Sequence, residues 1–182
     1  MKILVISDTH GSIAKVEEIA KRLTGIDLLV HLGDYSEDGW TLSQRLGIDV
    51  ITVKGNMDGE YAKKYEFFDV ECGKILITHG HLCGVNHSYN NLLYACEEEG
   101  CVAAFFGHTH VPCNEEIEGI RLLNPGSISR PRDGSEGSYA IVHTDEEGIE
   151  CSVIYYRKEG ELPKKKPQGG YLRALLNYSD RF

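Results

Sequence analysis

The 182-residue sequence has no apolar run that approaches the ~20 residues needed to span a membrane. Met1 and Lys2 lead directly into a short apolar stretch, without the longer hydrophobic segment and cleavage site of a secretory signal peptide. The sequence therefore favours a cytoplasmic protein with no membrane partner.

Basic residues are also in deficit, because 19 Lys and Arg face 28 Asp and Glu and give a formal net charge of −9. Binding to a nucleic-acid backbone needs clustered positive charge. A nucleic acid polymer is therefore disfavoured as a partner, and with it a nuclease that acts on long chains. An acidic protein can still bind a single phosphate group where bound metal ions reverse the charge locally.

Cysteine pairs of the kind that bind zinc or exchange disulfides are missing. The six cysteines form no C-x-x-C motif and no closely spaced disulfide framework. We expect free thiols in a reducing compartment, and none of the six is a candidate nucleophile. The sequence also lacks a convincing Ser-His-Asp or Cys-His arrangement.

What the sequence does contain is a series of short apolar runs, each followed by polar side chains. Gly107-His108-Thr109-His110 follows the apolar run 102–106. Residues i and i+2 of an extended chain point to the same side. His108 and His110 should therefore leave the strand on one face, a spacing suited to metal ligation. Asp8 and His10 have the same spacing after the apolar residues 3–6.

Five predicted strands place Asp, Asn or His just past their last apolar residue. The strands are expected at 3–6, 26–32, 50–53, 74–78 and 102–106, and the side chains are Asp8, His10, Asp34, Asn56, His79, His108 and His110. In layered α/β folds, ligands bind beyond the carboxyl ends of the strands. Seven side chains are too many for one four-coordinate ion, and they suit two ions that share a carboxylate. Nitrogen and oxygen ligands without thiolate favour Mn, Fe, Zn, Co or Ni.

Two metal ions about 4 Å apart are a known solution for the hydrolysis of phosphate esters. Such a pair neutralises the charge that grows in the transition state and lowers the pKa of a bridging water. The sequence therefore indicates metal-dependent hydrolysis of a small phosphate ester by a metal-bridging hydroxide, without a protein nucleophile.

The rest of the chain predicts further helices and strands. Helices are expected at 12–23, capped by Ser12, at 40–46 and around 92–96, running into the acidic residues 97–99. Strands are expected at 67–73, as a hairpin at 117–123, and as an antiparallel pair at 138–144 and 149–156.

The C-terminal part differs in composition from the rest. Residues 158–170 are polar and contain three consecutive lysines, whereas 171–176 carry apolar residues at helical spacing. We therefore divide the chain into a domain at 1–156 and a polar linker with an apolar tail at 157–182. The tail could fold onto its own core or contact a second subunit, which leaves a homo-oligomer open.

Five sequence blocks, in this order, resemble the calcineurin-like metallophosphoesterases. They are Asp8-x-His10, Gly33-Asp34, Gly55-Asn56-x-Asp58, Thr78-His79-Gly80-His81 and Gly107-His108-Thr109-His110. With Asn124-Pro125-Gly126-Ser127 downstream, their spacing is similar to that of the small YfcE-type phosphodiesterases of bacteria and archaea. The resemblance covers residues 1–156 and implies an α/β fold, a four-layer αββα sandwich of two mixed β-sheets flanked by helices. It also implies a preference for phosphodiesters.

The resemblance further implies a role for each block. One divalent ion would be held by Asp8, His10 and His110, and the other by Asn56, His79 and His108. Asp34 would bridge the two ions, for which manganese is our first choice and Ni, Zn, Fe or Co are alternatives. Asn56 would also touch the substrate phosphate, and Asp58 would orient neighbouring groups by hydrogen bonds.

One position departs from the pattern of the wider family. Many members carry a histidine after the Asn of the third block, and that histidine protonates the leaving oxygen. Here the position is Met57, which cannot donate a proton, although the YfcE-type subfamily also lacks this histidine. His81 is the nearest spare imidazole in sequence and is our candidate for the general acid or a phosphate contact, with a structural role as the alternative.

Other functions remain open at this point. A phosphomonoesterase or a nucleotide pyrophosphatase would use the same site. A non-catalytic scaffold is the alternative from another class, since the retromer subunit that resembles this family has lost metal-site residues. Every ligand position is filled in this sequence, which favours an enzyme.

Overall fold

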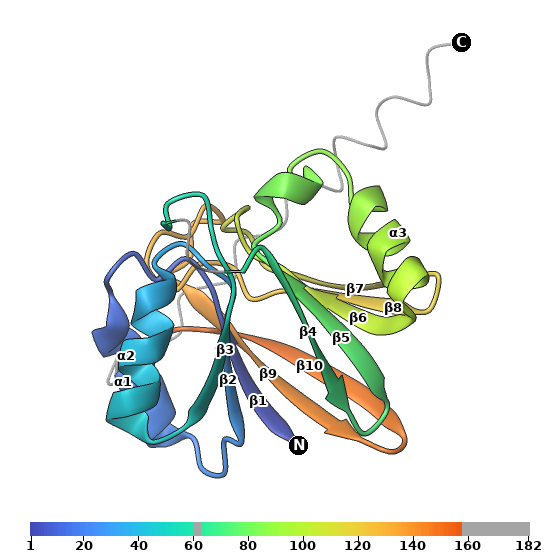
Figure 1. The fold of residues 1–182 in the computed structure, drawn as a ribbon. Helices are drawn as coiled ribbons and strands as arrows, with labels where there is room; N and C mark the ends of the chain where they lie inside the picture. The colour runs from blue at the N-terminus through green and yellow to red at the C-terminus, as the bar shows by residue number, and fades with distance from the viewer. Residues whose placement is uncertain (60–62, 158–182) are drawn as a thin grey trace, which may run out of the picture.

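The computed structural model describes residues 1–59 and 63–157. Two five-stranded sheets face each other, and helices cover their outer faces (Figure 1). The structure therefore confirms the predicted four-layer αββα sandwich with two mixed sheets.

The first sheet has the strand order β10-β9-β1-β2-β3. Strands β1, β2 and β3 are parallel, whereas β9 is antiparallel to both β1 and β10. The strands are β1 (Lys2–Ile6), β2 (Leu28–His31), β3 (Asp49–Thr52), β9 (Ser138–Asp145) and β10 (Gly148–Tyr155). Helices α1 (Ile13–Arg22) and α2 (Ser36–Leu46) connect the parallel strands and pack on the outer face.

The second sheet has the strand order β4-β5-β6-β8-β7. Strands β5, β6 and β8 are parallel, and β4 and β7 pair antiparallel at the two edges. The strands are β4 (Tyr65–Val70), β5 (Gly73–Thr78), β6 (Cys101–Phe105), β7 (Cys113–Ile117) and β8 (Ile120–Asn124). Helix α3 (Asn90–Glu99) packs on the outer face, and a short 3₁₀ helix, η1 (His81–Cys83), follows β5.

Both faces of the central strands are buried. In β1, Ile3 and Val5 belong to the cluster between the two sheets, whereas Leu4 and Ile6 pack toward α1 and α2. This burial on both sides explains why β1 is a continuous apolar run rather than an alternating one. The apolar layers hold the strand ends in place, and the polar loops emerge from those ends.

Three local predictions need correction. Helix α2 begins at Ser36 rather than residue 40, because the carboxylate of Asp58 accepts hydrogen bonds from the backbone of Tyr35 and Ser36 at its first turn. The hairpin of β7 and β8 extends beyond 117–123, through pairing from Cys113 to Asn124. Ser12 occupies the N-cap of α1, but its side chain makes no capping hydrogen bond.

All six cysteines lie within the described residues, and all are free thiols, as predicted. None of the helices within 1–59 and 63–157 has the length and apolar character that crossing a membrane requires. The predicted linker and tail fall outside the described residues from 158 onward.

Candidate metal centre

The seven candidate ligands all follow the carboxyl ends of strands. Three strands of the first sheet, β1, β2 and β3, carry four of them, and β5 and β6 of the second sheet carry the other three. Because the two sheets face each other, their loops meet at one end of the sandwich. The sequence predicted this gathering at strand ends, and the structure brings the side chains together in two neighbouring clusters.

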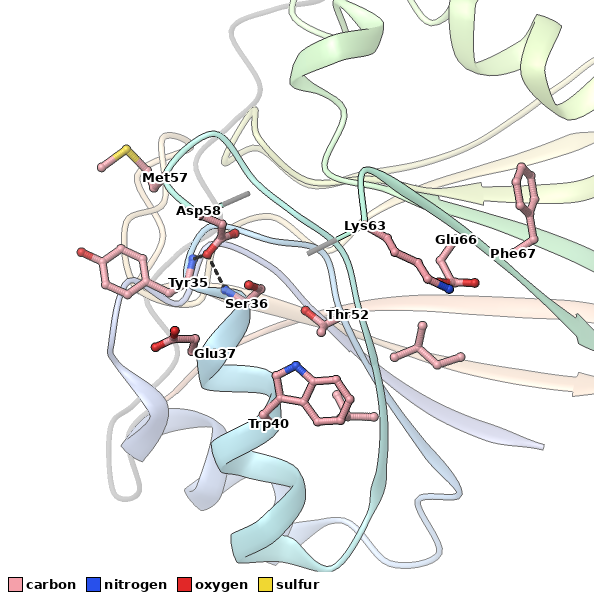
Figure 2. A pocket seen from close by; sticks show the side chains of 13 residues that line it. Tyr35, Ser36, Glu37, Trp40, Thr52, Met57, Asp58, Lys63, Glu66 and Phe67 are labelled. Carbon is pink, nitrogen blue, oxygen red and sulfur yellow. Dashed lines mark hydrogen bonds and ion pairs between the residues drawn. The ribbon is translucent and has the colours of Figure 1, made fainter. Parts of the chain in front are cut away.

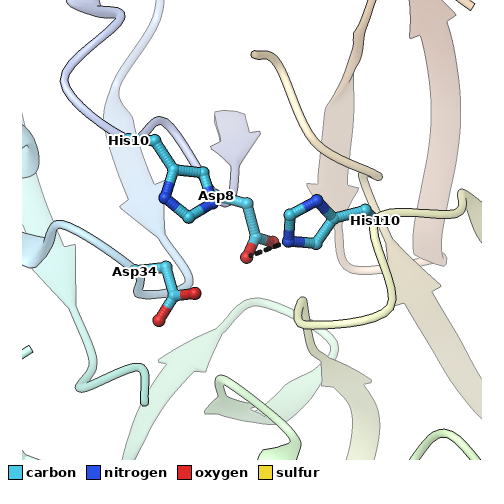
Figure 3. Close-up of side chains that lie close together, drawn as sticks. All are labelled: Asp8, His10, Asp34 and His110. Carbon is cyan, nitrogen blue, oxygen red and sulfur yellow. Dashed lines mark ion pairs between the residues drawn. The ribbon is translucent and has the colours of Figure 1, made fainter. Parts of the chain in front are cut away.

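The first cluster consists of Asp8, His10, Asp34 and His110 (Figure 3). Each offers one ligand atom, and these atoms all lie within 4.8 Å of one another. Oδ1 of Asp8 lies 3.1 Å from Nε2 of His110. Asp8, Asp34 and His110 are buried, so their charged and polar atoms face each other with little access to water.

The second cluster consists of Asn56, His79 and His108. Oδ1 of Asn56 lies 3.2 Å from Nε2 of His79 and 3.1 Å from Nδ1 of His108. Nε2 of His79 also lies 3.5 Å from Oδ1 of Asp34. Asp34 therefore adjoins both clusters, which is the position that the shared carboxylate of a two-ion site requires.

Hydrogen bonds to the outer ring nitrogens orient two of the histidines. Nδ1 of His79 lies 2.6 Å from the carbonyl oxygen of Leu32, and Nδ1 of His110 lies 2.6 Å from that of Arg130. A carbonyl oxygen only accepts, so each Nδ1 carries the proton and donates it. In the neutral form of each ring, Nε2 then has the lone pair that a metal ligand must offer, and it faces the cluster.

The two oxygens of the Asp8 carboxylate also differ in their surroundings. Its Oδ2 accepts hydrogen bonds from the hydroxyl of Ser7, at 2.6 Å, and from the backbone N–H of His108, at 3.2 Å. Within residues 1–59 and 63–157, its buried Oδ1 has no hydrogen-bond donor, and neither ring nitrogen of His10 has a hydrogen-bond partner. Buried polar atoms without partners are costly. A cation between these lone pairs would satisfy them, so the donor set fits a metal ion.

The electrostatics of the metal-free site also suit ligation. Burial lowers the pKa of His10 and of His108, which keeps both imidazoles neutral. Burial raises the pKa of Asp8, but its contacts with His110, His79 and Ser7 outweigh this and hold that pKa below its ordinary value. For His110, the Asp8 carboxylate outweighs burial and raises the pKa.

The backbone is strained at the same place. Five of the seven candidate ligands have positive φ: Asp8, His10, Asp34, His108 and His110, at 53°, 45°, 52°, 67° and 59°. Non-glycine residues rarely adopt this region, and such strain concentrates at functional sites.

Glycines allow the loops to approach one another closely. A Cβ atom on Gly55 would lie 2.2 Å from both the backbone nitrogen and Oδ1 of Asp34. A Cβ atom on Gly107 would lie 2.0 Å from Oγ of Ser7. The glycines of the Gly-Asn and Gly-His blocks are therefore explained by the packing of the metal-site loops.

Comparison with known proteins agrees with this geometry. Residues 1–147 match the family model described as the calcineurin-like phosphoesterase superfamily domain. The chain belongs to this superfamily. It is 36% identical to the probable metallophosphoesterase YsnB of Bacillus subtilis (strain 168), over 88% of this chain and 93% of that protein.

Two further proteins are similar to this chain. The phosphodiesterase YfcE of Escherichia coli (strain K12) is 30% identical, over 80% of this chain and 89% of that protein. The crystal structure of a conserved protein from Streptococcus pneumoniae TIGR4, described as a predicted phosphoesterase, superposes with a TM-score of 0.71 at 34% identity. That superposition covers 85% of this chain and 88% of the other. The resemblance read from the motifs, including its YfcE-type subfamily, is confirmed.

The structure places Asp58 between two of the metal-site loops. Its Oδ1 accepts hydrogen bonds from the backbone N–H groups of Tyr35 and Ser36, at 2.9 and 2.7 Å, and its Oδ2 accepts one from Gly55, at 2.8 Å. Asp58 thus ties the loop after β2 to the loop after β3, an arrangement consistent with the orienting role that the resemblance implies.

His81 lies beside the second cluster. The centroid of its ring is 5.2 Å from that of His79 and 6.0 Å from that of His108. Among the described residues, its buried Nδ1 has no hydrogen-bond partner. Burial lowers the pKa of the ring, so a role as general acid would require a bound phosphate anion to stabilise its protonated form. His81 therefore borders the histidines of the second cluster.

The sequence did not single out Thr9, Asp38 or Asn86. Nδ2 of Asn86 lies 3.0 Å from Nε2 of His108, on the side of the ring that faces away from Asn56. If Nδ1 of His108 binds a metal ion, Nε2 carries the proton and needs an acceptor. The side-chain oxygen of Asn86 can accept this hydrogen bond once the amide group is flipped by a half-turn. The contact of Asn86 with His108 spans 22 residues of sequence, and the contact of Thr9 with Asp38 spans 29, so no local motif indicates either one.

A pocket of about 970 Å³ lies next to the centre (Figure 2). Its lining includes Tyr35, Met57 and Asp58 near the metal-site loops and Trp40 on α2. The ring of Tyr35 also contacts the ring of His10 edge-on, with centroids 5.4 Å apart. None of the seven candidate ligands lines the pocket, so it adjoins the centre without containing it.

Proposed function

We propose that this phosphoesterase hydrolyses small phosphate esters, phosphodiesters in particular, with two divalent transition-metal ions. Asp8, His10 and His110 would hold one ion, Asn56, His79 and His108 would hold the other, and Asp34 would be shared by both. Manganese is the first choice of metal, with Ni, Zn, Fe or Co as alternatives.

One observation carries the proposal: two clusters of ligand atoms share Asp34, and the buried Oδ1 of Asp8 has no donor. Two divalent ions bound here would act as Lewis acids, neutralise phosphate charge and activate water. The chain's own residues orient the site. Leu32 and Arg130 fix the tautomers of His79 and His110, and Asp58 holds the Asn56 loop against the Asp34 loop.

The substrate would be bound from the exposed side of the second cluster. Asn56 is exposed and His108 is half-buried, whereas Asp8 and His79 are buried. A phosphate group would therefore meet Asn56 first, with His81 beside it. The YfcE relative supports the preference for diesters, since its name is that of a phosphodiesterase.

Matched chromogenic substrates test the diester preference. Bis-(4-nitrophenyl) phosphate and 4-nitrophenyl phosphate share a leaving group, so their kcat/KM values differ mainly through the second ester group. We expect a higher kcat/KM for the diester with Mn²⁺ added. A higher value for the monoester would favour a phosphomonoesterase, and cleavage of a nucleotide anhydride above both would favour a pyrophosphatase.

A further inference from the structure

A chain of hydrogen bonds runs beside the metal centre, through side chains that the proposed reaction does not use. His31 is buried in β2, Thr9 is buried between Asp8 and His10, and Asp38 lies in the first turn of α2. Nε2 of His31 lies 2.9 Å from Oγ1 of Thr9, which in turn lies 2.6 Å from Oδ2 of Asp38. We call Asp38, Thr9 and His31 the relay.

The donors and acceptors give the relay one direction. The backbone N–H of Gly33 donates to Nδ1 of His31, at 3.2 Å, so Nδ1 carries no proton and Nε2 does. Nε2–H then donates to the hydroxyl of Thr9, whose own hydrogen goes to the carboxylate of Asp38. Oδ2 of Asp38 also accepts the backbone N–H of Gly11, at 2.8 Å.

The hydrogen bonds of the relay lie next to strained backbone in both loops. Asp8 and His10, with φ of 53° and 45°, flank Thr9, and Asp34, with φ of 52°, follows Gly33. Strained residues persist only where their surroundings determine them. The hydrogen bonds of the relay hold Thr9 and Gly11 in one loop and Gly33 in the other, so each of the three strained ligands is next in sequence to a residue that the relay holds.

We propose that Asp38, Thr9 and His31 are positioning residues of the metal centre. Their hydrogen bonds hold the loop after β1 against the loop after β2, which sets the Asp34 carboxylate relative to Asp8 and His10. One backbone hydrogen bond, from Asp8 N to Gly33 O at 3.1 Å, joins the same loops, and the relay adds side-chain ties on either side of it. The inference rests on the proposed metal-dependent function, because the geometry it protects is that of the first cluster.

A relay that serves only folding would change the stability of the metal-free protein and leave metal affinity unchanged. Thr9→Val removes the hydroxyl at nearly constant shape, and Thr9→Ser retains it. Thr144→Val is the matched control, because Thr144 is also buried and also donates to a carboxylate, Oε2 of Glu71 at 2.5 Å. Thr144 belongs to β9 and to none of the metal-site loops.

The measurement is a calorimetric titration of the metal-free protein with Mn²⁺ alone, beside chemical denaturation of the same samples. We expect Thr9→Val to raise the Kd for Mn²⁺ by about 10- to 100-fold, as loss of a group that supports metal ligands does elsewhere. Thr9→Ser should restore the wild-type Kd, and Thr144→Val should lower only stability. An unchanged Kd in Thr9→Val, or a Thr9→Ser protein that binds as weakly, would overturn the proposal.

A second series tests the relay as one unit, and its comparison of two Asp38 variants does not depend on Thr9→Val being folded. Asp38→Ala removes both acceptor contacts, whereas Asp38→Asn retains a carbonyl oxygen, so the alanine variant should bind Mn²⁺ more weakly. In the double variant with Thr9→Val, we expect a Kd no higher than that of the weaker-binding single variant. Fold changes that multiply, or equal Kd values for Asp38→Ala and Asp38→Asn, would contradict a relay.

Failure of the relay can be told apart from failure of the proposed function. The titration contains no substrate, so a wild-type protein that binds Mn²⁺ but hydrolyses no ester would overturn the function and leave the relay result standing. A wild-type protein that takes up no Mn²⁺ would overturn both before any variant is compared.

Discussion

Asp34 is the most important single residue for the proposed metal site, because it is the only one of the seven candidate ligands that we assign to both ions. Its carboxylate adjoins the other three members of the first cluster and lies 3.5 Å from His79 of the second. Its Oδ1 also accepts the backbone N–H of Met57, at 2.9 Å, so it links the loop after β2 to the loop after β3. Its charge and its position are both needed.

Asp34→Asn keeps the shape of the side chain and removes its charge. We expect kcat on a diester to fall by at least about 100-fold, the upper range seen when groups that merely support metal ligands are lost. Metal content should fall with it, while the circular dichroism spectrum stays that of the wild type. Asp69→Asn, an equal charge change on exposed β4, is the control. Full turnover after metals are stripped and replaced would remove the bridging assignment.

His81 can be tested through the leaving group. A general acid matters more for an alkyl alcohol, which leaves poorly as an anion, than for a phenol. We therefore expect His81→Ala to lower kcat more with an alkyl ester than with a 4-nitrophenyl ester. Equal losses with both esters would leave His81 a phosphate contact and the general acid unassigned.

His31 makes stability depend on pH. Burial lowers its pKa to about 4, whereas the unfolded chain has the ordinary value of 6.5. Below pH 6.5 the unfolded state binds more protons than the folded state at this residue, so stability falls as the pH drops from 6.5 toward 4. Between pH 7 and pH 5 this amounts to about 2 kcal/mol.

His31→Asn retains an acceptor for Gly33 and does not titrate. Denaturant unfolding of the metal-free proteins at both pH values should show the wild type losing about 2 kcal/mol more than the variant. Parallel losses would mean that His31 is protonated in the folded state.

At the scale of elements, the site is made by loops that follow parallel strands. β1, β2, β3, β5 and β6 end at the same edge of the sandwich, and the short loops place polar side chains there (Figure 1). This much could be predicted from the sequence, because apolar runs followed by Asp, Asn or His are local patterns. The antiparallel pair β9 and β10 was also predicted, because two strand-like segments joined by a turn are a local pattern too.

The sequence could not reveal contacts between distant loops. Helix α2 was predicted too short because its first turn depends on Asp58, 22 residues beyond Ser36. Thr9 and Asp38, 29 residues apart, meet only in the folded chain. The strained backbone at Asp8 or His108 has no local signal either, since these residue types usually have negative φ.

Close approach of two of these loops makes Gly55 sensitive to substitution. In Gly55→Ala the new Cβ atom would lie 2.2 Å from Asp34, so the Asp34 and Asn56 loops must separate. We expect a stability loss of roughly 1–3 kcal/mol and weaker metal binding. Gly59→Ala is the matched control, because no atom of the described residues lies within 4 Å of its added Cβ atom, and its stability should change by less than about 0.5 kcal/mol. Equal thermal unfolding midpoints for the two variants would contradict this packing.

At the scale of the molecule, this acidic protein would have to attract the anionic substrate that we propose. The net charge is −9, and the candidate site itself contains the buried carboxylates of Asp8 and Asp34. Two divalent cations would reverse the charge at the site without changing the acidic surface. We therefore expect the metals to be needed for phosphate binding as well as for hydrolysis, and we expect no hydrolysis in their absence.

The most direct test of this account is metal analysis of the purified protein beside a bis-(4-nitrophenyl) phosphate assay, with metals stripped and re-added one at a time. We predict about two transition-metal ions per chain, no activity in the stripped protein, and activity restored by Mn²⁺ or by a related ion. A protein that retains no metal and hydrolyses the diester with none of these ions would contradict the account, and would favour a scaffold that keeps the ligands without the chemistry.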